Sequence, residues 1–167
     1  MMAKTNLGDL LMNIPHVESP LVTAYFDGAC EPRNPGGNMG FGAYILKNGT
    51  KVCEWSDFAL QDAKNTNNVA EYKACLWALK TIIEKKLQHE RVIIHGDSKL
   101  VVNQMNGHWK IKGGHYTPYA VECLQLIQQF KSIRFKWIPR EQNAYADELS
   151  KRELTSRGVK IAVRKKI

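Results

Sequence analysis

The 167-residue sequence lacks the features that define several common classes of protein. No uninterrupted apolar run reaches the roughly 18 residues of a membrane-spanning helix, so we expect no membrane partner. The first 20 residues lack the continuous apolar stretch of a secretory signal. Cysteine is scarce, and no pair has the C-x-x-C spacing of a zinc or redox motif. The four cysteines are Cys30, Cys53, Cys75 and Cys123. We expect a cytoplasmic protein with free, mostly buried thiols, although a disulfide stays open until the geometry is known.

Charge is modest over most of the chain and concentrated at its C-terminal end. The net charge is +8, and residues 151–167 contain seven Lys and Arg residues against one acid, Glu153. A basic tail favours a polyanionic partner, and nucleic acid is the commonest polyanion in a cell. The alternative is a solvated tail that only aids solubility. The apolar share of 44% and charged share of 24% exclude collagen-like, coiled-coil and wholly disordered chains.

Apolar periodicity divides the chain into a leader, one domain and a tail. Residues 1–20 form the leader, residues 21–155 the domain and residues 156–167 the basic tail. Four leader residues have the spacing of a short amphipathic helix: Leu7, Leu10, Leu11 and Ile14. Apolar residues alternate along 159–163, which predicts either an added edge strand or a free segment. A single domain of this size is expected to be a monomer.

Within the domain, periodicity predicts a mixed α/β sheet with the element order βββαβααβα. An Asn-Gly pair at 48–49 is a strong hairpin signal between the second and third strands. The predicted strands are 21–27, 38–47, 50–58, 91–96 and 132–139, and the predicted helices are 66–86, 97–105, 117–131 and 143–154.

Four acids lie at the ends of these predicted elements. Asp27 and Asp97 close apolar strands, whereas Glu71 and Asp147 lie early in helices. Each acid has an ordinary explanation, because Asp-Gly forms turns, Asp caps helices, and acids favour helix N-termini. Together they indicate a carboxylate cluster at one rim of the sheet.

Clustered carboxylates repel one another, so such a cluster needs neutralising cations. All-oxygen ligation suits hard divalent cations, and Mg²⁺ or Mn²⁺ are the natural occupants. A pair of such ions supports hydrolysis of a phosphodiester, because one activates water and the other stabilises the leaving oxygen. The acids and the basic tail therefore point to metal-dependent chemistry on a polyanion.

Four sequence blocks resemble type I ribonuclease H, in order and in spacing. They are FDGACEPRNPGG, TNNVAEYKACLWAL, HGDSKLVVNQMNGHW and WIPREQNAYADELS, and the resemblance covers about residues 20–155. It implies the ribonuclease H-like fold, a five-stranded mixed sheet flanked by helices. It also implies an endoribonuclease that cuts the RNA strand of an RNA–DNA hybrid, leaving 5′-phosphate and 3′-hydroxyl ends.

The resemblance assigns roles to the four acids. Asp27 would bridge two metal ions, which are present when substrate is bound. Glu71 and Asp97 would hold the ion on the leaving side, and Asp147 the ion that activates water. Glu71 would also contact the RNA 2′-hydroxyl, the group that distinguishes RNA from DNA.

The resemblance also suggests residues that bind the hybrid. Asn34 and Asn67 would lie in the minor groove, and Thr66 with Asn68 would seat the DNA strand. The remaining candidates are Trp109, on a DNA sugar, and Asn103, in the groove. Trp109 has a packing role as its alternative, and Asn103 an ordinary place in solvent.

Three departures from the best-known bacterial form bear on function. The segment before Asn34 is one residue longer, and the basic handle helix is missing, with only Lys110 and Lys112 in its place. Arg140 stands where many relatives have a histidine that helps the product leave. Arg grips phosphate with two donors but cannot shuttle a proton near neutral pH. The alternative for Arg140 is a plain surface residue.

Three rival functions share this fold or these motifs. Resolvases, transposases and integrases act on DNA with a similar acid set, but the TNN-x-x-E and NPG blocks argue against them. A catalytically dead hybrid-binding module would have lost an acid, and none is missing. A domain detached from a reverse transcriptase stays open.

Overall fold

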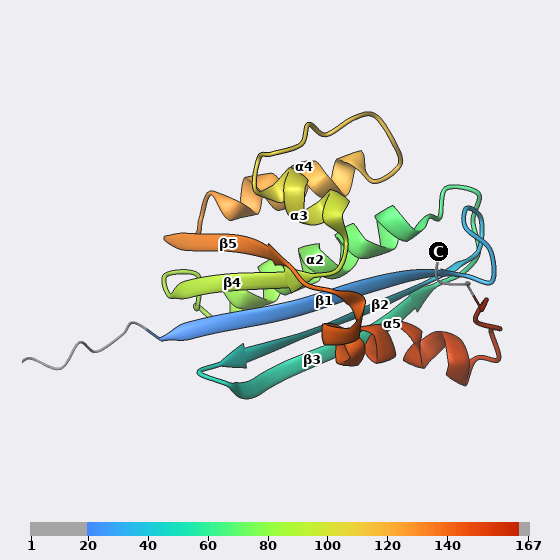
Figure 1. The fold of residues 1–167 in the computed structure, drawn as a ribbon, viewed down its shortest axis with the longest axis horizontal. Helices are drawn as coiled ribbons and strands as arrows, with labels where there is room; N and C mark the ends of the chain where they lie inside the picture. Colours follow the sequence, from blue (N-terminus) through green and yellow to red (C-terminus); the bar gives the residue numbers. More distant parts are fainter. Residues whose placement is uncertain (1–19, 164–167) are drawn as a thin grey trace, which may run out of the picture.

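A computed structural model describes residues 20–163, which form a five-stranded mixed sheet with helices on both faces (Figure 1). The strand order is β3-β2-β1-β4-β5, which confirms the predicted fold class. The predicted leader helix and the last four residues of the tail lie outside the described residues. Within residues 20–163, no helix is both long and apolar enough to cross a membrane.

The first three strands form an antiparallel meander, as predicted. They are β1 (Leu21–Glu31), β2 (Asn38–Lys47) and β3 (Thr50–Ala59). Asn48 and Gly49 both have positive φ, which confirms the tight hairpin. The other two strands, β4 (Arg91–Gly96) and β5 (Ser132–Trp137), run parallel to β1.

β1 is four residues longer than the sequence predicts. Asp27 therefore lies inside this strand, opposite Gly42 of β2, and does not close it. The prediction failed because the Gly- and Pro-containing segment after Asp27 is typical of a loop, whereas pairing with β2 continues to Glu31. Parallel pairing with β4 ends earlier, at Tyr25 and His95. Asp27 thus stands just beyond the end of β4, where a side chain can face an open cleft.

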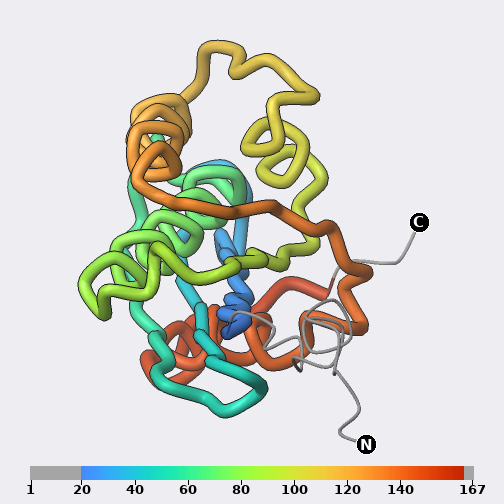
Figure 2. The backbone as a smooth tube through the Cα atoms, turned by 90° about the vertical axis from the view of Figure 1, so that its left-hand side faces the viewer, coloured from blue at the N-terminus to red at the C-terminus, as the bar shows by residue number. Residues whose placement is uncertain are grey.

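Three helices cover one face of the sheet, and the last helix covers the other (Figure 2). The first group comprises α2 (Asn67–Glu84), α3 (Lys99–Met105) and α4 (Thr117–Ile127). A 3-10 turn, Arg140–Gln142, leads into α5 (Ala144–Ser156). Thr66 caps α2 and Ser98 caps α3 through their side-chain oxygens. The core between α2 and the sheet is apolar, with Phe26 and Leu79 fully buried.

Glycines in β2 let α5 approach the sheet closely. A Cβ atom at Gly40 would lie 1.8 Å from the carbonyl oxygen of Ser150, and one at Gly42 would lie 2.4 Å from the backbone nitrogen of Ser150. Only glycine leaves room for this contact between backbones. The depth of α5, and therefore the position of Asp147 in its first turn, depends on these two residues.

The chain after α5 returns to the end of β1. Gly158 has a φ of 77° and reverses the chain, and the Ala162 backbone N–H donates to Glu31 Oε2 at 2.9 Å. The described part of the tail, through residue 163, forms no strand, so the predicted edge strand is absent there. All four cysteines are free, and three of them are buried, as expected.

The packing of α5 on β2 leads to a stability prediction. Gly42→Ala places a methyl group against backbone atoms that cannot move separately, so we expect a loss of about 3 kcal/mol in the free energy of unfolding. Gly113→Ala is the control, because its Cβ meets nothing within 4 Å, and we expect a change below about 1 kcal/mol. Urea unfolding of both variants measures the difference. Equal stability of the two variants would contradict the close packing of α5.

Candidate active site

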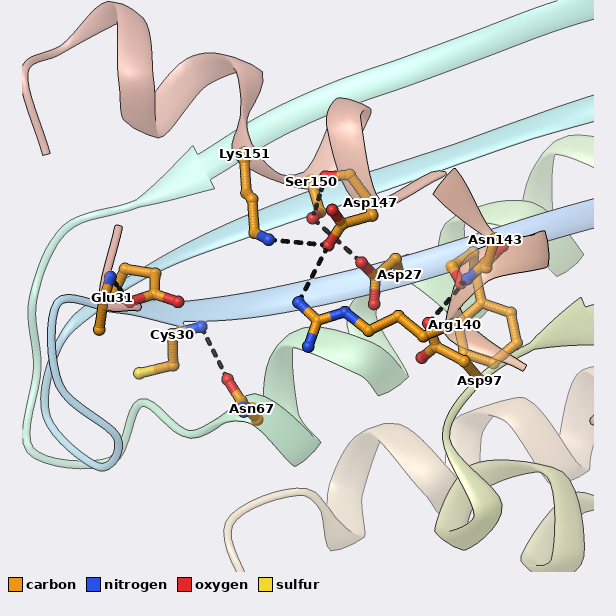
Figure 3. A network of polar contacts seen from close by, with 12 residues as sticks. Asp27, Cys30, Glu31, Asn67, Asp97, Arg140, Asn143, Asp147, Ser150 and Lys151 are labelled. Atoms are coloured by element: carbon orange, nitrogen blue, oxygen red, sulfur yellow. Dashed lines mark hydrogen bonds and ion pairs between the residues drawn. The ribbon is translucent and has the colours of Figure 1, made fainter. Parts of the chain in front are cut away.

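The four acids predicted from the sequence line one cleft, of about 290 Å³. Asp27 comes from β1, Glu71 from the start of α2, Asp97 from the residue after β4, and Asp147 from the first turn of α5. Carboxylate oxygens of the first three lie within 4.8 Å of one another. Figure 3 shows Asp147 and Asp97 on either side of Asp27. Four elements that are distant in the sequence thus meet at one rim.

A close contact between α2 and β1 brings Glu71 to Asp27. A Cβ at Gly28 would lie 2.3 Å from the Glu71 backbone nitrogen and 2.3 Å from the Ala70 carbonyl carbon. Gly28 therefore allows the backbone of α2 to rest on the strand next to Asp27. The Asp27-Gly28 pair, which is typical of a turn, here serves a helix–strand contact.

Burial makes the negative charge of the cluster unfavourable. Asp27 and Glu71 are only 6% and 8% exposed. Burial, with the charge of Asp97 as the next cause, raises the pKa of Asp27 to about 8. Burial and the charges of Asp27 and Asp97 raise the pKa of Glu71 well above its ordinary value. Burial also raises the pKa of Asp97, against the opposing effects of Asn143 and Arg140.

Asp147 differs from the other three acids because two cations face it. Lys151 Nζ lies 2.9 Å and Arg140 Nη2 lies 3.5 Å from Asp147 Oδ1 (Figure 3). Burial alone would raise the pKa of Asp147, but the hydrogen bond and charge of Lys151 outweigh it and lower the pKa. Asp147 is therefore the acid that carries its charge most readily.

Sequence reasoning missed three polar residues that support the acids. Lys151 stands four residues after Asp147, the helical spacing of an ion pair, and that signal was available. Ser150 Oγ lies 3.3 Å from Asp27 Oδ2 and 2.7 Å from the Asp147 carbonyl oxygen. Asn143 is 1% exposed, and its Nδ2 donates to the Phe26 carbonyl oxygen at 3.0 Å and to Asp97 Oδ2 at 3.4 Å. In the sequence, Asn143 is only the first residue of the last predicted helix.

Two of the residues predicted to bind the minor groove, Asn34 and Asn67, are joined by a hydrogen bond, and the second of them reaches the acidic cleft. Asn67 lines it and accepts a hydrogen bond from the Cys30 backbone N–H at 2.8 Å. Asn34 Oδ1 accepts from the Asn67 backbone N–H at 3.1 Å, which ties the loop after β1 to the start of α2. The Thr66 hydroxyl is used as the cap of α2, and Asn68 is exposed beside it.

Two predicted residues lie away from the acids. Trp109 is 49% exposed beyond the end of α3, so the packing alternative does not describe it. The Asn103 side chain donates to the Lys99 carbonyl oxygen at 2.8 Å, within its own helix. Neither residue lines the acidic cleft.

Comparisons with known proteins agree with this architecture. The family model described as reverse transcriptase-like matches residues 25–153. A curated protein named ribonuclease H, from Chlorobaculum parvum, is 35% identical over 67% of this chain and 73% of its own length. The chain belongs to the ribonuclease H family. The chain also resembles a longer protein, the bifunctional protein Rv2228c of Mycobacterium tuberculosis. The two are 37% identical over 70% of this chain. The chain spans about a third of that protein, because the match covers 31% of its length.

Two solved structures of ribonucleases H align over most of the chain. RNase H1 from the archaeon Halobacterium salinarum has a TM-score of 0.71 and 30% identity, over 81% of this chain and 98% of that one. LC11-RNase H1, from compost and in complex with an RNA/DNA hybrid, has a TM-score of 0.70 and 31% identity. That match covers 80% of this chain and 99% of the other.

The donor set of the cleft fits a divalent cation. The negatively charged groups that line the cleft are all carboxylates, whose oxygens are the ligands that hard cations such as Mg²⁺ prefer. The buried Oε2 of Glu71 has no hydrogen-bond partner among the described residues, and a buried carboxylate oxygen is costly to leave without one. A cation held by Asp27, Glu71 and Asp97 would satisfy that oxygen and neutralise the cluster.

The raised pKa of Asp27 predicts how stability depends on pH without metal. Between the ordinary value of 3.8 and about 8, the folded protein holds a proton that the unfolded chain has released. In EDTA, the free energy of unfolding should therefore fall as pH rises through this range. Asp27→Asn removes this contribution, so its stability should depend less on pH. Urea unfolding at pH 5, 6, 7 and 8 tests the difference, and parallel profiles for the two proteins would contradict it.

Proposed function

We propose that this chain is an endoribonuclease that hydrolyses the RNA strand of RNA–DNA hybrids with two divalent cations, leaving 5′-phosphate and 3′-hydroxyl ends. The observation that carries the proposal is the trio Asp27, Glu71 and Asp97, with carboxylate oxygens within 4.8 Å in a ribonuclease H fold. The hybrid bound to LC11-RNase H1 supports the choice of substrate. All four acids are present and converge, which argues against a catalytically dead module.

In this proposal the four acids of the cleft have separate tasks. Asp27 lies between Asp97 and Asp147 (Figure 3), which supports the proposal that it would hold both ions. Glu71 and Asp97 would hold the ion on the leaving side, and Asp147 the ion on the water side. Bound divalent cations would supply a deprotonated water and neutralise charge on the leaving oxygen. Ser150 Oγ and Asn143 Nδ2 lie within hydrogen-bond distance of Asp27 and Asp97, so these two side chains would help to orient the acids.

Recognition of the RNA strand would begin beside the catalytic acids. Glu71 would contact the 2′-hydroxyl next to the cut, and Asn67, which lines the same cleft, would bind beside it. The Asn34 side chain accepts a hydrogen bond from the Asn67 backbone N–H and is exposed, so a hybrid could reach it. Contacts to sugars carry no information about base sequence. Recognition of this kind therefore suits an enzyme that acts on hybrids of any sequence.

Asp27→Asn tests the function directly. It keeps the shape of the side chain and removes a charge from the bridge between the two ions, so hybrid cleavage in Mg²⁺ should fall about 10³-fold while the fold survives. The assay uses a labelled RNA–DNA hybrid, a DNA duplex and an RNA duplex, each with Mg²⁺, with Mn²⁺ and with EDTA. Wild-type protein should cut only the hybrid, and only with metal.

The matched control is Asp57→Asn. Asp57 is an exposed acid on β3 outside the cleft, so this variant should cleave the hybrid like the wild type. Retention of more than about a tenth of wild-type activity by Asp27→Asn would show that Asp27 does not bridge the ions. Cleavage of the DNA duplex at a similar rate would contradict the proposed substrate.

Arg140 is proposed to act on the product. Its guanidinium is 64% exposed and reaches Asp147 at 3.5 Å, so it can leave that carboxylate to grip a phosphate. Arg140→Ala should slow multiple turnover more than single turnover, since product departure follows the chemical step. Arg140→Lys, which keeps the charge, should recover part of the loss. Equal slowing in both regimes would place Arg140 in the chemical step, and no effect would make it a surface residue.

A further inference from the structure

Trp137 lies in the acidic cleft but has no role in the function described so far. It is the last residue of β5 and lines the same cleft as the four acids. Its indole Nε1 donates to the backbone carbonyl oxygen of Asp97 at 3.1 Å. The Lys99 ammonium, from the start of α3, lies 5.0 Å from the ring centroid of Trp137. The indole thus forms the wall of the cleft next to Asp97.

The exposure of Trp137 is unusual for its position. Phe135, two residues earlier on the same strand, is 5% exposed, whereas Trp137 is 42% exposed. Among the described residues, only Trp137 and Trp109 are aromatic side chains with this much exposure, and only Trp137 borders the acids. A large aromatic surface open to solvent beside a reactive centre is typical of a contact with substrate.

We propose that Trp137 packs on the sugar–base face of the RNA nucleotide next to the scissile phosphate, and that Lys99 contacts a neighbouring phosphate. The inference rests on the proposed hydrolysis of hybrids and names a further contact of that site. The strand that is cut must place its phosphate at Asp27 and Asp97. A side chain that is hydrogen-bonded to the backbone of Asp97 would therefore contact the cut strand, which is RNA in this proposal.

The chemistry of both side chains suits this partner. Aromatic packing on a nucleotide tolerates any base, because every base has an apolar face. Lys99 is exposed, so leaving the ring of Trp137 for a phosphate costs it little desolvation. In a chain without a basic handle helix, this pair adds affinity close to the cut.

The indole hydrogen bond to Asp97 suggests a purely positioning role for Trp137 as the alternative. Two substitutions separate the possibilities. Trp137→Phe loses the N–H but keeps an aromatic ring, and Trp137→Leu loses both. A packing contact distinguishes Phe from Leu, whereas a role through the N–H alone does not.

Binding without cleavage is the first measurement. A fluorescent hybrid is titrated with each protein in Ca²⁺, which should permit binding while supporting little cleavage. We expect Trp137→Leu to raise Kd about 10-fold and Trp137→Phe less than 3-fold. Lys99→Met, which keeps the apolar stem, should reduce the slope of log affinity against log salt by about 1 unit. Circular dichroism checks that the three variants are folded.

Turnover in Mg²⁺ is the second measurement. We expect Trp137→Leu to raise KM with a smaller change in kcat, and Trp137→Phe to approach the wild type. Equal losses of kcat in both variants with unchanged Kd would overturn the contact in favour of positioning, and wild-type Kd and KM in Trp137→Leu would overturn it outright. If the wild type cleaves hybrids while these variants fail to differ, the proposed function stands and this inference falls. A wild type that neither binds nor cuts hybrids overturns both.

Discussion

Repulsion among buried carboxylates is the physical constraint on which the arrangement of the cleft depends. Asp27 and Glu71 are almost inaccessible to water, and Asp97 lies within 4.8 Å of both. Such a cluster opposes folding unless protons or cations neutralise it. The raised pKa of Asp27 is a consequence, because protonation removes one of the repelling charges. The close contact at Gly28 nonetheless holds Glu71 beside Asp27. The packing of the fold therefore keeps together groups that would separate in free solution.

The remaining polar residues of the cleft respond to this constraint in different ways. Lys151 and Arg140 supply positive charge to Asp147, so that acid stays ionised while its neighbours favour protonation. Asn143 uses its amide to join the backbone of β1 to the Asp97 carboxylate. A cleft with cations on one side and a concentration of negative charge on the other suits divalent ions and a phosphate chain together.

Much of the fold was predictable because its signals are local. The Asn48-Gly49 hairpin, the apolar β4 and the Thr66 cap each follow from a few neighbouring residues. The full length of β1 was not predictable from the sequence, because the residues after Asp27 favour a loop. Only pairing with β2 extends the strand to Glu31. Lys151 had a usable signal in its spacing from Asp147. Asn143 and Trp137 had no such signal, because each bonds to a backbone carbonyl far away in the sequence. The separation is 117 positions for Asn143 and 40 positions for Trp137.

The sequence by itself determined the set of acids, the order of the elements and the family that these motifs resemble, because each depends on residue type and spacing along the chain. Only the tertiary structure decided that Asp27 lies within a strand and that Asp147 has two cationic neighbours. It alone placed Trp137 on the wall of the cleft. Distances between side chains on separate elements follow from how closely backbones pack. At Gly28, Gly40 and Gly42 that closeness is set by the absence of a side chain, whose consequence appears only when the elements meet.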